Sequence, residues 1–215
     1  MTVSLDRPWL TFDLGEPMRV LSWALNRPGF VTARRIVWRE VRNADLPEGF
    51  DVRKWLETEL QKRDAVDSIA FLTSRNIDRF QQATATIGAV RADAVATVGL
   101  SNAERIGYRQ PKSAVSYGTI NVAVRLNTGL SEAGLIEAMS IVVQARTAAV
   151  MDADIALPSG PATGTGTDCV AIAAPPGSTD YAGLHTDIGK AIGRAVYDAV
   201  FSGAKEWKEE VTANA

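Results

Sequence analysis

The sequence predicts one α+β domain in which a mixed, largely antiparallel β-sheet is packed by long helices. The chain has 215 residues, a length that one hydrophobic core supports. Predicted hairpins and helices are mixed along the chain and do not alternate regularly as strand and helix, so a doubly wound parallel sheet is disfavoured. No linker, change of composition or internal repeat divides residues 1–215, which we therefore treat as a single domain.

The first predicted elements form a hairpin. Apolar, aromatic and β-branched residues fill segments 19–25 and 31–41. Residues 26–29 between them read Asn-Arg-Pro-Gly, which is a typical turn sequence. We therefore expect two antiparallel strands joined by this turn.

A helix and three strands are expected next. Asp51 is a predicted helix N-cap, because apolar residues follow it at helical spacing. These residues are Val52, Trp55, Leu56 and Leu60. Short apolar runs bounded by polar residues or glycine predict strands over 66–73, 94–100 and 119–126.

The second half of the sequence predicts two long helices on either side of a buried strand. Ser131 is placed to cap a helix that continues to about Met151 and carries a buried apolar stripe. A loop rich in glycine and threonine, residues 159–168, then leads into an apolar strand over 170–174. The spacing of apolar residues predicts a last helix over 183–206.

Charge and cysteine content disfavour several classes of protein. The formal charge is -2, and the 23 Lys and Arg residues are scattered, so no nucleic-acid partner is expected. The first residues lack a signal-peptide pattern and no run of 18 apolar residues occurs, so we expect neither secretion nor a membrane partner. A single cysteine, Cys169, cannot form an intramolecular disulfide. We therefore expect a cytoplasmic protein.

The segment from Thr163 to Asp168 is the first candidate for chemistry. Its glycines and threonines expose backbone N–H groups and hydroxyls together, which suits binding of an anion or of a developing oxyanion. The alternative from composition alone is a flexible turn. A nucleotide triphosphatase is disfavoured, because the Walker lysine is absent and the loop precedes a strand instead of opening a helix.

Asp168 stands where this loop meets the predicted strand. The alternation of side chains along a strand sends Asp168 and Val170 to one face of the sheet and Cys169 to the other. A half-buried carboxylate there either takes part in acid-base chemistry or caps the loop. Cys169 is interpreted as a packing residue, since it lies in an apolar strand.

His185 is the second candidate, as the only histidine of the chain. In the first turn of the predicted last helix, the positive helix end would disfavour a charged imidazole, and a neutral imidazole suits a proton shuttle. The alternative is a histidine on a surface turn. Asp152 and Asp154 with Asp168 are a weaker candidate for a metal site, and we interpret them as solvated acids, so no metal is expected.

Several segments together resemble the adenosylcobinamide amidohydrolase family. Their order and spacing match over nearly the whole chain, with a long alanine-rich helix between the second and the third. The matching segments are Gly99-Leu100-Ser101-Asn102-Ala103, Gly118-Thr119-Ile120-Asn121, Ala162-Thr163-Gly164-Thr165-Gly166-Thr167-Asp168, Tyr181-Ala182-Gly183 and His185-Thr186.

The resemblance implies an enzyme that removes the aminopropanol arm of adenosylcobinamide by amide hydrolysis, giving adenosylcobyric acid during corrinoid salvage for cobalamin synthesis. Within the matching segments, residue chemistry assigns catalysis to Asp168, His185, Thr165 and Thr167. Substrate binding is assigned to Ser101, Asn102, Asn121, Thr163, Gly164, Gly166 and Tyr181. No cofactor is expected, the partner is a small corrinoid, and a homo-oligomer is compatible with the sequence.

Two alternatives stay open at this point. The first is a corrinoid carrier without hydrolytic activity, in which His185 is not expected to ligate cobalt because the Asp-x-His-x-x-Gly pattern of the mutases is absent. The second is an amidase for an unrelated small amide. The sequence also departs from the family pattern in the turn over 26–29. A second departure lies at Gln144 and Arg146, where the family segment commonly reads Glu-Ala-Lys.

Overall fold

The computed structural model describes residues 1–42, 45, 49–108 and 118–213. The long strands of this part of the chain are β1 (Thr2–Asp6), β2 (Trp9–Ser22), β3 (Gly29–Glu40), β4 (Ile69–Thr73), β5 (Gln81–Ile87), β6 (Val90–Val98), β8 (Ile120–Leu126) and β12 (Cys169–Ala174). The helices are α1 (Val52–Lys62), α2 (Glu132–Asp152), α3 (Asp187–Ala213) and the 3₁₀ turn η2 (Ile77–Arg79). Four two-residue strands complete the described elements: β7 (Ala103–Glu104), β9 (Ala156–Leu157), β10 (Gly160–Pro161) and β11 (Gly164–Thr165).

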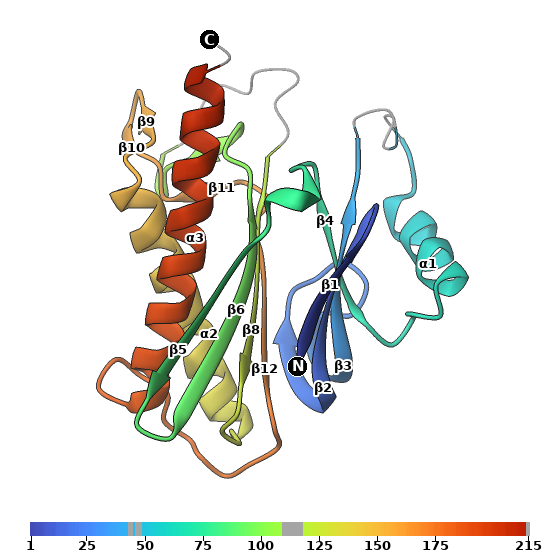
Figure 1. Ribbon diagram of the computed structural model, residues 1–215, viewed down its shortest axis with the longest axis vertical. Helices are drawn as coiled ribbons and strands as arrows, with labels where there is room; N and C mark the ends of the chain where they lie inside the picture. Colours follow the sequence, from blue (N-terminus) through green and yellow to red (C-terminus); the bar gives the residue numbers. More distant parts are fainter. Residues whose placement is uncertain (43–44, 46–48, 109–117, 214–215) are drawn as a thin grey trace.

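The eight long strands form one sheet (Figure 1). Seven of them follow the order β4-β3-β2-β12-β8-β6-β5, and β1 pairs with the first residues of β2, from Trp9 to Asp13. The pairs β12–β8 and β3–β4 are parallel, whereas the other pairs of this sheet are antiparallel. The predicted α+β fold with a mixed, largely antiparallel sheet is therefore confirmed.

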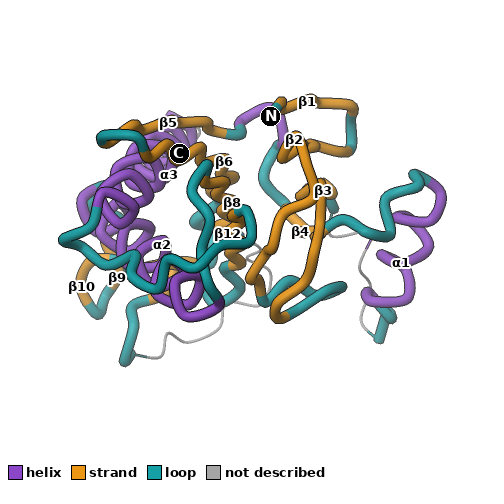
Figure 2. Tube along the Cα trace, turned by 90° about the horizontal axis from the view of Figure 1, so that it is seen from below, coloured by secondary structure: helices purple, strands orange, loops and turns teal. Residues whose placement is uncertain are grey.

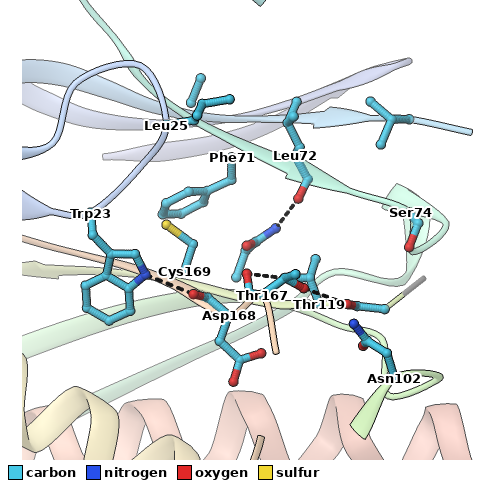
Figure 3. Close-up of a pocket in the computed structure, with 14 residues that line it drawn as sticks. Trp23, Leu25, Phe71, Leu72, Ser74, Asn102, Thr119, Thr167, Asp168 and Cys169 are labelled. Atoms are coloured by element: carbon cyan, nitrogen blue, oxygen red, sulfur yellow. Dashed lines mark hydrogen bonds between the residues drawn. The ribbon is translucent and has the colours of Figure 1, made fainter. Parts of the chain in front are cut away.

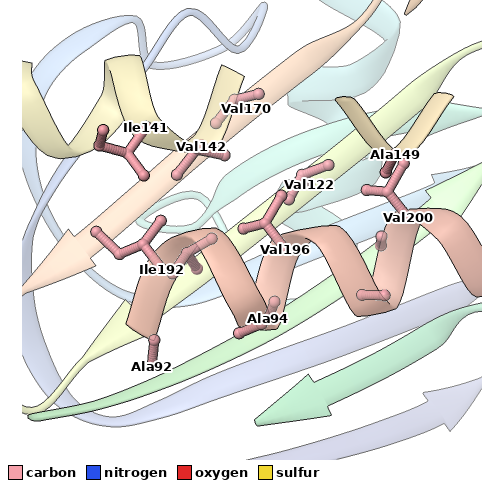
Figure 4. Packing of buried hydrophobic residues seen from close by; sticks show 14 of the residues in the cluster. Ala92, Ala94, Val122, Ile141, Val142, Ala149, Val170, Ile192, Val196 and Val200 are labelled. Carbon is pink, nitrogen blue, oxygen red and sulfur yellow. The ribbon is translucent and has the colours of Figure 1, made fainter. Parts of the chain in front are cut away.

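Helices α2 and α3 pack together on one face of the sheet (Figures 1 and 4). Alternate residues of β8 and β12, among them Val122 and Val170, are buried beneath these helices. Their neighbours Ala123 and Ala171 face the opposite side, where they join a second core with Phe12. Because both faces of the central strands are buried, the positions of residues at the ends of β8 and β12 are fixed by packing.

The second core lies between the central strands and the N-terminal strands β1 to β4. Trp38 on β3 and Phe71 on β4 pack edge to face with ring centroids 5.1 Å apart. Helix α1 covers the far side of β3 and β4 through Leu56 and Leu60 (Figure 2). Asn121 on β8 donates to the Leu72 carbonyl at 2.7 Å, so β4 is tied across the sheet to the end of β8.

Local signals in the sequence predicted the starts of α1 and α2 correctly. Asp51 and Ser131 cap α1 and α2, and their side chains accept the backbone N–H of Lys54 and Gly134. The predicted start of the last helix is wrong. Helix α3 begins at Asp187, four residues later than expected, and Thr186 accepts the N–H of Gly189 at its start.

Helix α2 has the length and apolar composition that would suffice to cross a membrane. In this structure it packs against α3 and β12 and contributes to the first core. This packing buries part of its apolar surface, including Leu135, Ile141 and Val142, whereas Ile136 is exposed.

Candidate active site at the glycine and threonine loop

The loop from Thr163 to Asp168 is organised around one carboxylate. The Asp168 side chain is only 6% exposed and accepts four hydrogen bonds. Oδ1 accepts the Ile120 N–H at 3.0 Å and the Thr165 hydroxyl at 2.5 Å. Oδ2 accepts the Thr165 N–H at 3.0 Å and Nη1 of Arg146 at 2.6 Å. These donors fill the carboxylate and join the loop, β8 and α2 at one point.

The position of Asp168 follows from the alternation along β12. Its carboxylate lies on the face that carries Val170 and meets α2, whereas Cys169 lies on the face of the second core. Figure 3 shows the Cys169 sulfur and the Asp168 carboxylate pointing to opposite sides of the strand. The predicted alternation is therefore confirmed.

Arg146 is the functional residue that the sequence analysis missed. It lies on α2, its side chain is 13% exposed, and its remaining Nη2 donates to Thr147 Oγ1 at 3.2 Å. A buried carboxylate and guanidinium at this distance each offset the cost of burying the other. The one available signal was the family-like segment at residues 144–149, in which Arg146 stands where the family commonly has lysine.

The three loop threonines have different partners. Thr163 donates to the Glu104 carbonyl at 3.3 Å and accepts the Ile106 N–H at 2.8 Å, so both hydrogen bonds of its hydroxyl are to backbone groups. Thr167 donates to the Gly118 carbonyl at 2.8 Å. Thr165, in contrast, donates to a carboxylate, the arrangement that polarises a hydroxyl for nucleophilic attack.

Two glycines permit the close approach of these groups. A Cβ on Gly164 would lie 2.5 Å from Asp168 Oδ2 and 3.5 Å from Arg146 Cζ. A Cβ on Gly118 would lie 2.8 Å from the Asn102 side-chain oxygen and from the Gly99 carbonyl. Any larger residue at either position would displace the loop or the turn after β6.

Two pockets flank the loop. The first, called the loop pocket, has a volume of about 430 Å³ and contains Thr165 and Arg146. Its other lining residues are Glu104, Arg105, Ile106, Gly107, Tyr108, Val143, Thr147, Thr163, Gly164, Gly166 and Asp168. The second, called the tryptophan pocket, has a volume of about 360 Å³ and is drawn in Figure 3. It is lined by Trp23, Leu25, Val41, Ala70, Phe71, Leu72, Ser74, Asn102, Gly118, Thr119, Asn121, Thr167, Asp168 and Cys169.

Comparison with known protein families gives a match over residues 2–212 to the adenosylcobinamide amidohydrolases. The chain belongs to this family. The match covers both cores, the loop and the two pockets. The family match therefore includes every helix and strand that positions the candidate site of this amidohydrolase.

Two individual proteins are also similar. An uncharacterized protein of Methanocaldococcus jannaschii, MJ1613, is 34% identical over 87 residues, which are 39% of this chain and 34% of that protein. The aligned part is therefore about a third of the relative's length. A solved beta-aminopeptidase from Burkholderia sp. matches over 91% of this chain and 78% of its own, with 13% identity and a TM-score of 0.46.

Most of the residues predicted for the amidohydrolase site lie around the two pockets. Thr163, Gly164, Thr165, Gly166 and Asp168 line the loop pocket. The tryptophan pocket contains Asn102, Asn121 and Thr167, and Asp168 is common to both. Ser101 is exposed in the turn beside Asn102 and lines neither pocket.

The structure does not bring Tyr181 and His185 to this site. Both side chains are exposed, and the neighbouring Ala182 N–H donates to Glu137 on α2 at 2.6 Å. Arg146, which holds Asp168, follows Glu137 by nine residues on the same helix. At the α-helical rise this places the two contacts roughly 13 Å apart along α2. His185 also precedes α3 and does not lie in the first turn of that helix, where the sequence predicted it.

We expect the variant His185→Gln to keep turnover of the proposed substrate within about twofold, because its side chain lies away from the loop. Turnover should be measured over a range of pH with the wild-type protein beside it. A loss of about a hundredfold, the scale of general acid-base help, would restore His185 as the proton shuttle.

Cys169 lies in the wall of the tryptophan pocket without the properties of a nucleophile. Burial raises the pKa of its thiol to about 12, so the thiolate is scarce at neutral pH.

We expect iodoacetamide at pH 8 to label the folded protein far more slowly than the urea-unfolded protein. Equal labelling rates would contradict this. Because the unfolded chain releases this proton first, the raised pKa also lowers stability as the pH rises above about 9.

Within the described residues, no three His, Cys, Asp or Glu side chains are grouped in a way that could hold a metal ion. Asp152 accepts the hydroxyl of Tyr197 at 2.8 Å, and Asp154 lies 4.0 Å from Lys208. Neither acid shares a contact with Asp168, so the weaker candidate for a metal site is not assembled.

Proposed function

We propose that this protein hydrolyses the amide that joins aminopropanol to the corrinoid in adenosylcobinamide, releasing adenosylcobyric acid. The observation that carries the proposal is the family match over residues 2–212. The loop pocket supports it, because a hydroxyl, a carboxylate and a cation converge there.

Thr165 is the proposed nucleophile. Amide hydrolysis needs an attacking oxygen and a group that receives its proton, and the Thr165 hydroxyl already donates to Asp168. Arg146 donates to the other carboxylate oxygen and holds Asp168 in place. Thr167 and Thr163 have backbone acceptors and are proposed to shape the loop.

The proposed reaction has two balanced steps. The Thr165 oxygen bonds to the amide carbonyl carbon, the carbon–nitrogen bond breaks, and the hydroxyl proton passes through Asp168 to the departing aminopropanol. Water then attacks the resulting ester, which gives the acid and restores the Thr165 hydroxyl. The sum is one amide and one water converted to one carboxylic acid and one amine.

The loop pocket accepts the amide arm, and the corrin macrocycle remains outside. A volume of about 430 Å³ suits a small branched chain but not a corrin ring. Arg105 lies at the rim, where it donates to the Pro161 carbonyl at 3.0 Å and stands over the Tyr108 ring. We propose that these rim residues contact the corrinoid edge.

One observation favours a second function, a corrinoid carrier without turnover. Both oxygens of Asp168 are occupied by four donors, which is also what an anchoring carboxylate requires. Incubation of the protein with adenosylcobinamide, followed by mass spectrometry, separates the two functions. The amidohydrolase forms adenosylcobyric acid over many turnovers, whereas the carrier binds the corrinoid and returns it unchanged.

A further inference from the structure

Trp23 makes a long-range contact to the residue at the centre of the candidate site. It directly follows β2 and is 45% exposed. Its indole N–H donates to the backbone carbonyl of Asp168 at 2.9 Å, as the dashed line in Figure 3 shows. None of the proposed catalytic steps uses this ring, yet it binds the backbone of the residue whose carboxylate organises the loop.

This hydrogen bond stands where the pairing of β12 with β2 has ended. The last backbone pair is Ala171 with Ser22, and the chain leaves the sheet at Trp23. Backbone carbonyls beyond the end of a ladder still need donors. Two side chains from this end of β2 supply them, because Ser22 Oγ donates to the Val170 carbonyl at 2.8 Å and Trp23 donates to that of Asp168. Side chains therefore continue the support of β12 as far as the loop.

Asp168 is held at both its side chain and its backbone. Its carboxylate accepts donors from Ile120, Thr165 and Arg146, and its backbone carbonyl accepts the indole N–H of Trp23. Without the indole donor, the peptide group after Asp168 loses this support, and a rotation of that peptide shifts the carboxylate relative to the Thr165 hydroxyl. Proton transfer needs a donor–acceptor separation of about 2.6–3.2 Å, and a misplacement of about 1 Å can lower a rate by roughly a hundredfold.

We propose that Trp23 is a positioning residue, whose indole N–H holds the Asp168 backbone so that the carboxylate stays aligned with the Thr165 hydroxyl. The ring lines the tryptophan pocket, whereas Thr165 lines the loop pocket, and Asp168 is common to both. Trp23 thus acts through Asp168 and contacts neither the nucleophile nor the reacting amide. This inference rests on the proposed function, because that function gives Asp168 the proton of Thr165.

Trp23→Phe and Ser22→Ala form a matched pair of variants. Each removes one side-chain donor to a β12 carbonyl at the same end of β2, but the acceptor of Ser22 is Val170, two residues beyond Asp168. Ser22 also accepts the Ala24 N–H, so its loss removes at least as many hydrogen bonds. A purely structural role predicts similar effects of the two variants, whereas a positioning role predicts loss of turnover in Trp23→Phe alone.

Steady-state kinetics with adenosylcobinamide give the first readout. We expect Trp23→Phe to lower kcat at least about tenfold with KM within about twofold of the wild type, and Ser22→Ala to change neither by more than about twofold. Circular dichroism and thermal melting show that the variants are folded. Benzothienylalanine at position 23, in which sulfur replaces the indole N–H and the shape is kept, provides a second variant with the same expected result. An unchanged kcat in both folded Trp23 variants, or a rise in KM alone, would overturn the inference.

Amide hydrogen exchange, measured by NMR, gives a readout that does not depend on turnover. The backbone N–H groups of Ile120 and Thr165 both donate to the Asp168 carboxylate. If Trp23 holds this carboxylate in place, both groups should exchange at least about fivefold faster in Trp23→Phe and within about twofold of the wild-type rate in Ser22→Ala. Unchanged exchange in the Trp23 variants, or an equal increase in Ser22→Ala, would overturn the inference.

The two readouts separate this inference from the proposed function. Faster exchange in the Trp23 variants of a protein that forms no adenosylcobyric acid would uphold the hold of Trp23 on Asp168 while the proposed hydrolysis fails. Turnover by the wild-type protein that both Trp23 variants retain in full would do the reverse.

Discussion

Replacing Thr165 with valine is expected to lower turnover of adenosylcobinamide by about 10²–10⁴-fold, because it removes the hydroxyl that donates to Asp168 and lines the loop pocket. Valine has nearly the shape of threonine, so the backbone N–H of residue 165 can still bind Asp168. The rate should be measured with purified protein at saturating substrate, together with the melting temperature.

Two matched variants make this result specific. Thr165→Ser keeps a hydroxyl and should retain measurable turnover. Thr167→Val changes the neighbouring loop hydroxyl, which donates to the Gly118 carbonyl, and should cost less than about tenfold. If Thr167→Val loses more turnover than Thr165→Val, the roles that we assign to the two threonines are reversed.

The second large effect is expected on stability. Arg146→Met leaves the Asp168 carboxylate almost completely buried without its cation, and removing one partner of a buried ion pair costs about 3–5 kcal/mol. Asp168→Asn should be similarly destabilising. The carboxylate accepts hydrogen bonds from four donors, and the NH2 group of asparagine would face two of these donors without being able to accept from them.

Urea unfolding followed by circular dichroism measures both variants and the double variant Arg146→Met with Asp168→Asn. The double variant should be more stable than the sum of the single losses predicts, since neither residue then leaves the other unpaired. Purely additive losses, or single losses below about 1 kcal/mol, would contradict a structural role of this ion pair.

The sequence predicted those elements whose signals are local. Asp51 and Ser131 were recognised as caps because the cap and the helix that it starts are adjacent in sequence. Strand β5, with the sequence Gln-Gln-Ala-Thr-Ala-Thr-Ile, was missed because an edge strand with many polar residues has no strong apolar run. Strand β1 was missed for the same reason, since most of its residues are exposed.

The candidate site was predictable only in part. Asp168 was found because the alternation of a strand determines the face on which its first residues lie. Arg146 and Trp23 reach Asp168 from 22 and 145 residues away, and no spacing rule connects such positions. His185 was placed with Asp168 because nothing in the sequence shows how far the segment before α3 lies from the loop.

The most direct test of the central claim is a single-turnover reaction with the protein in excess over adenosylcobinamide, analysed by mass spectrometry. The proposed function predicts adenosylcobyric acid and aminopropanol in equal amounts for the wild-type protein, and almost none with Thr165→Val over the same time. Adenosylcobinamide that remains intact after prolonged incubation with the folded wild-type protein would contradict the claim and favour a corrinoid carrier.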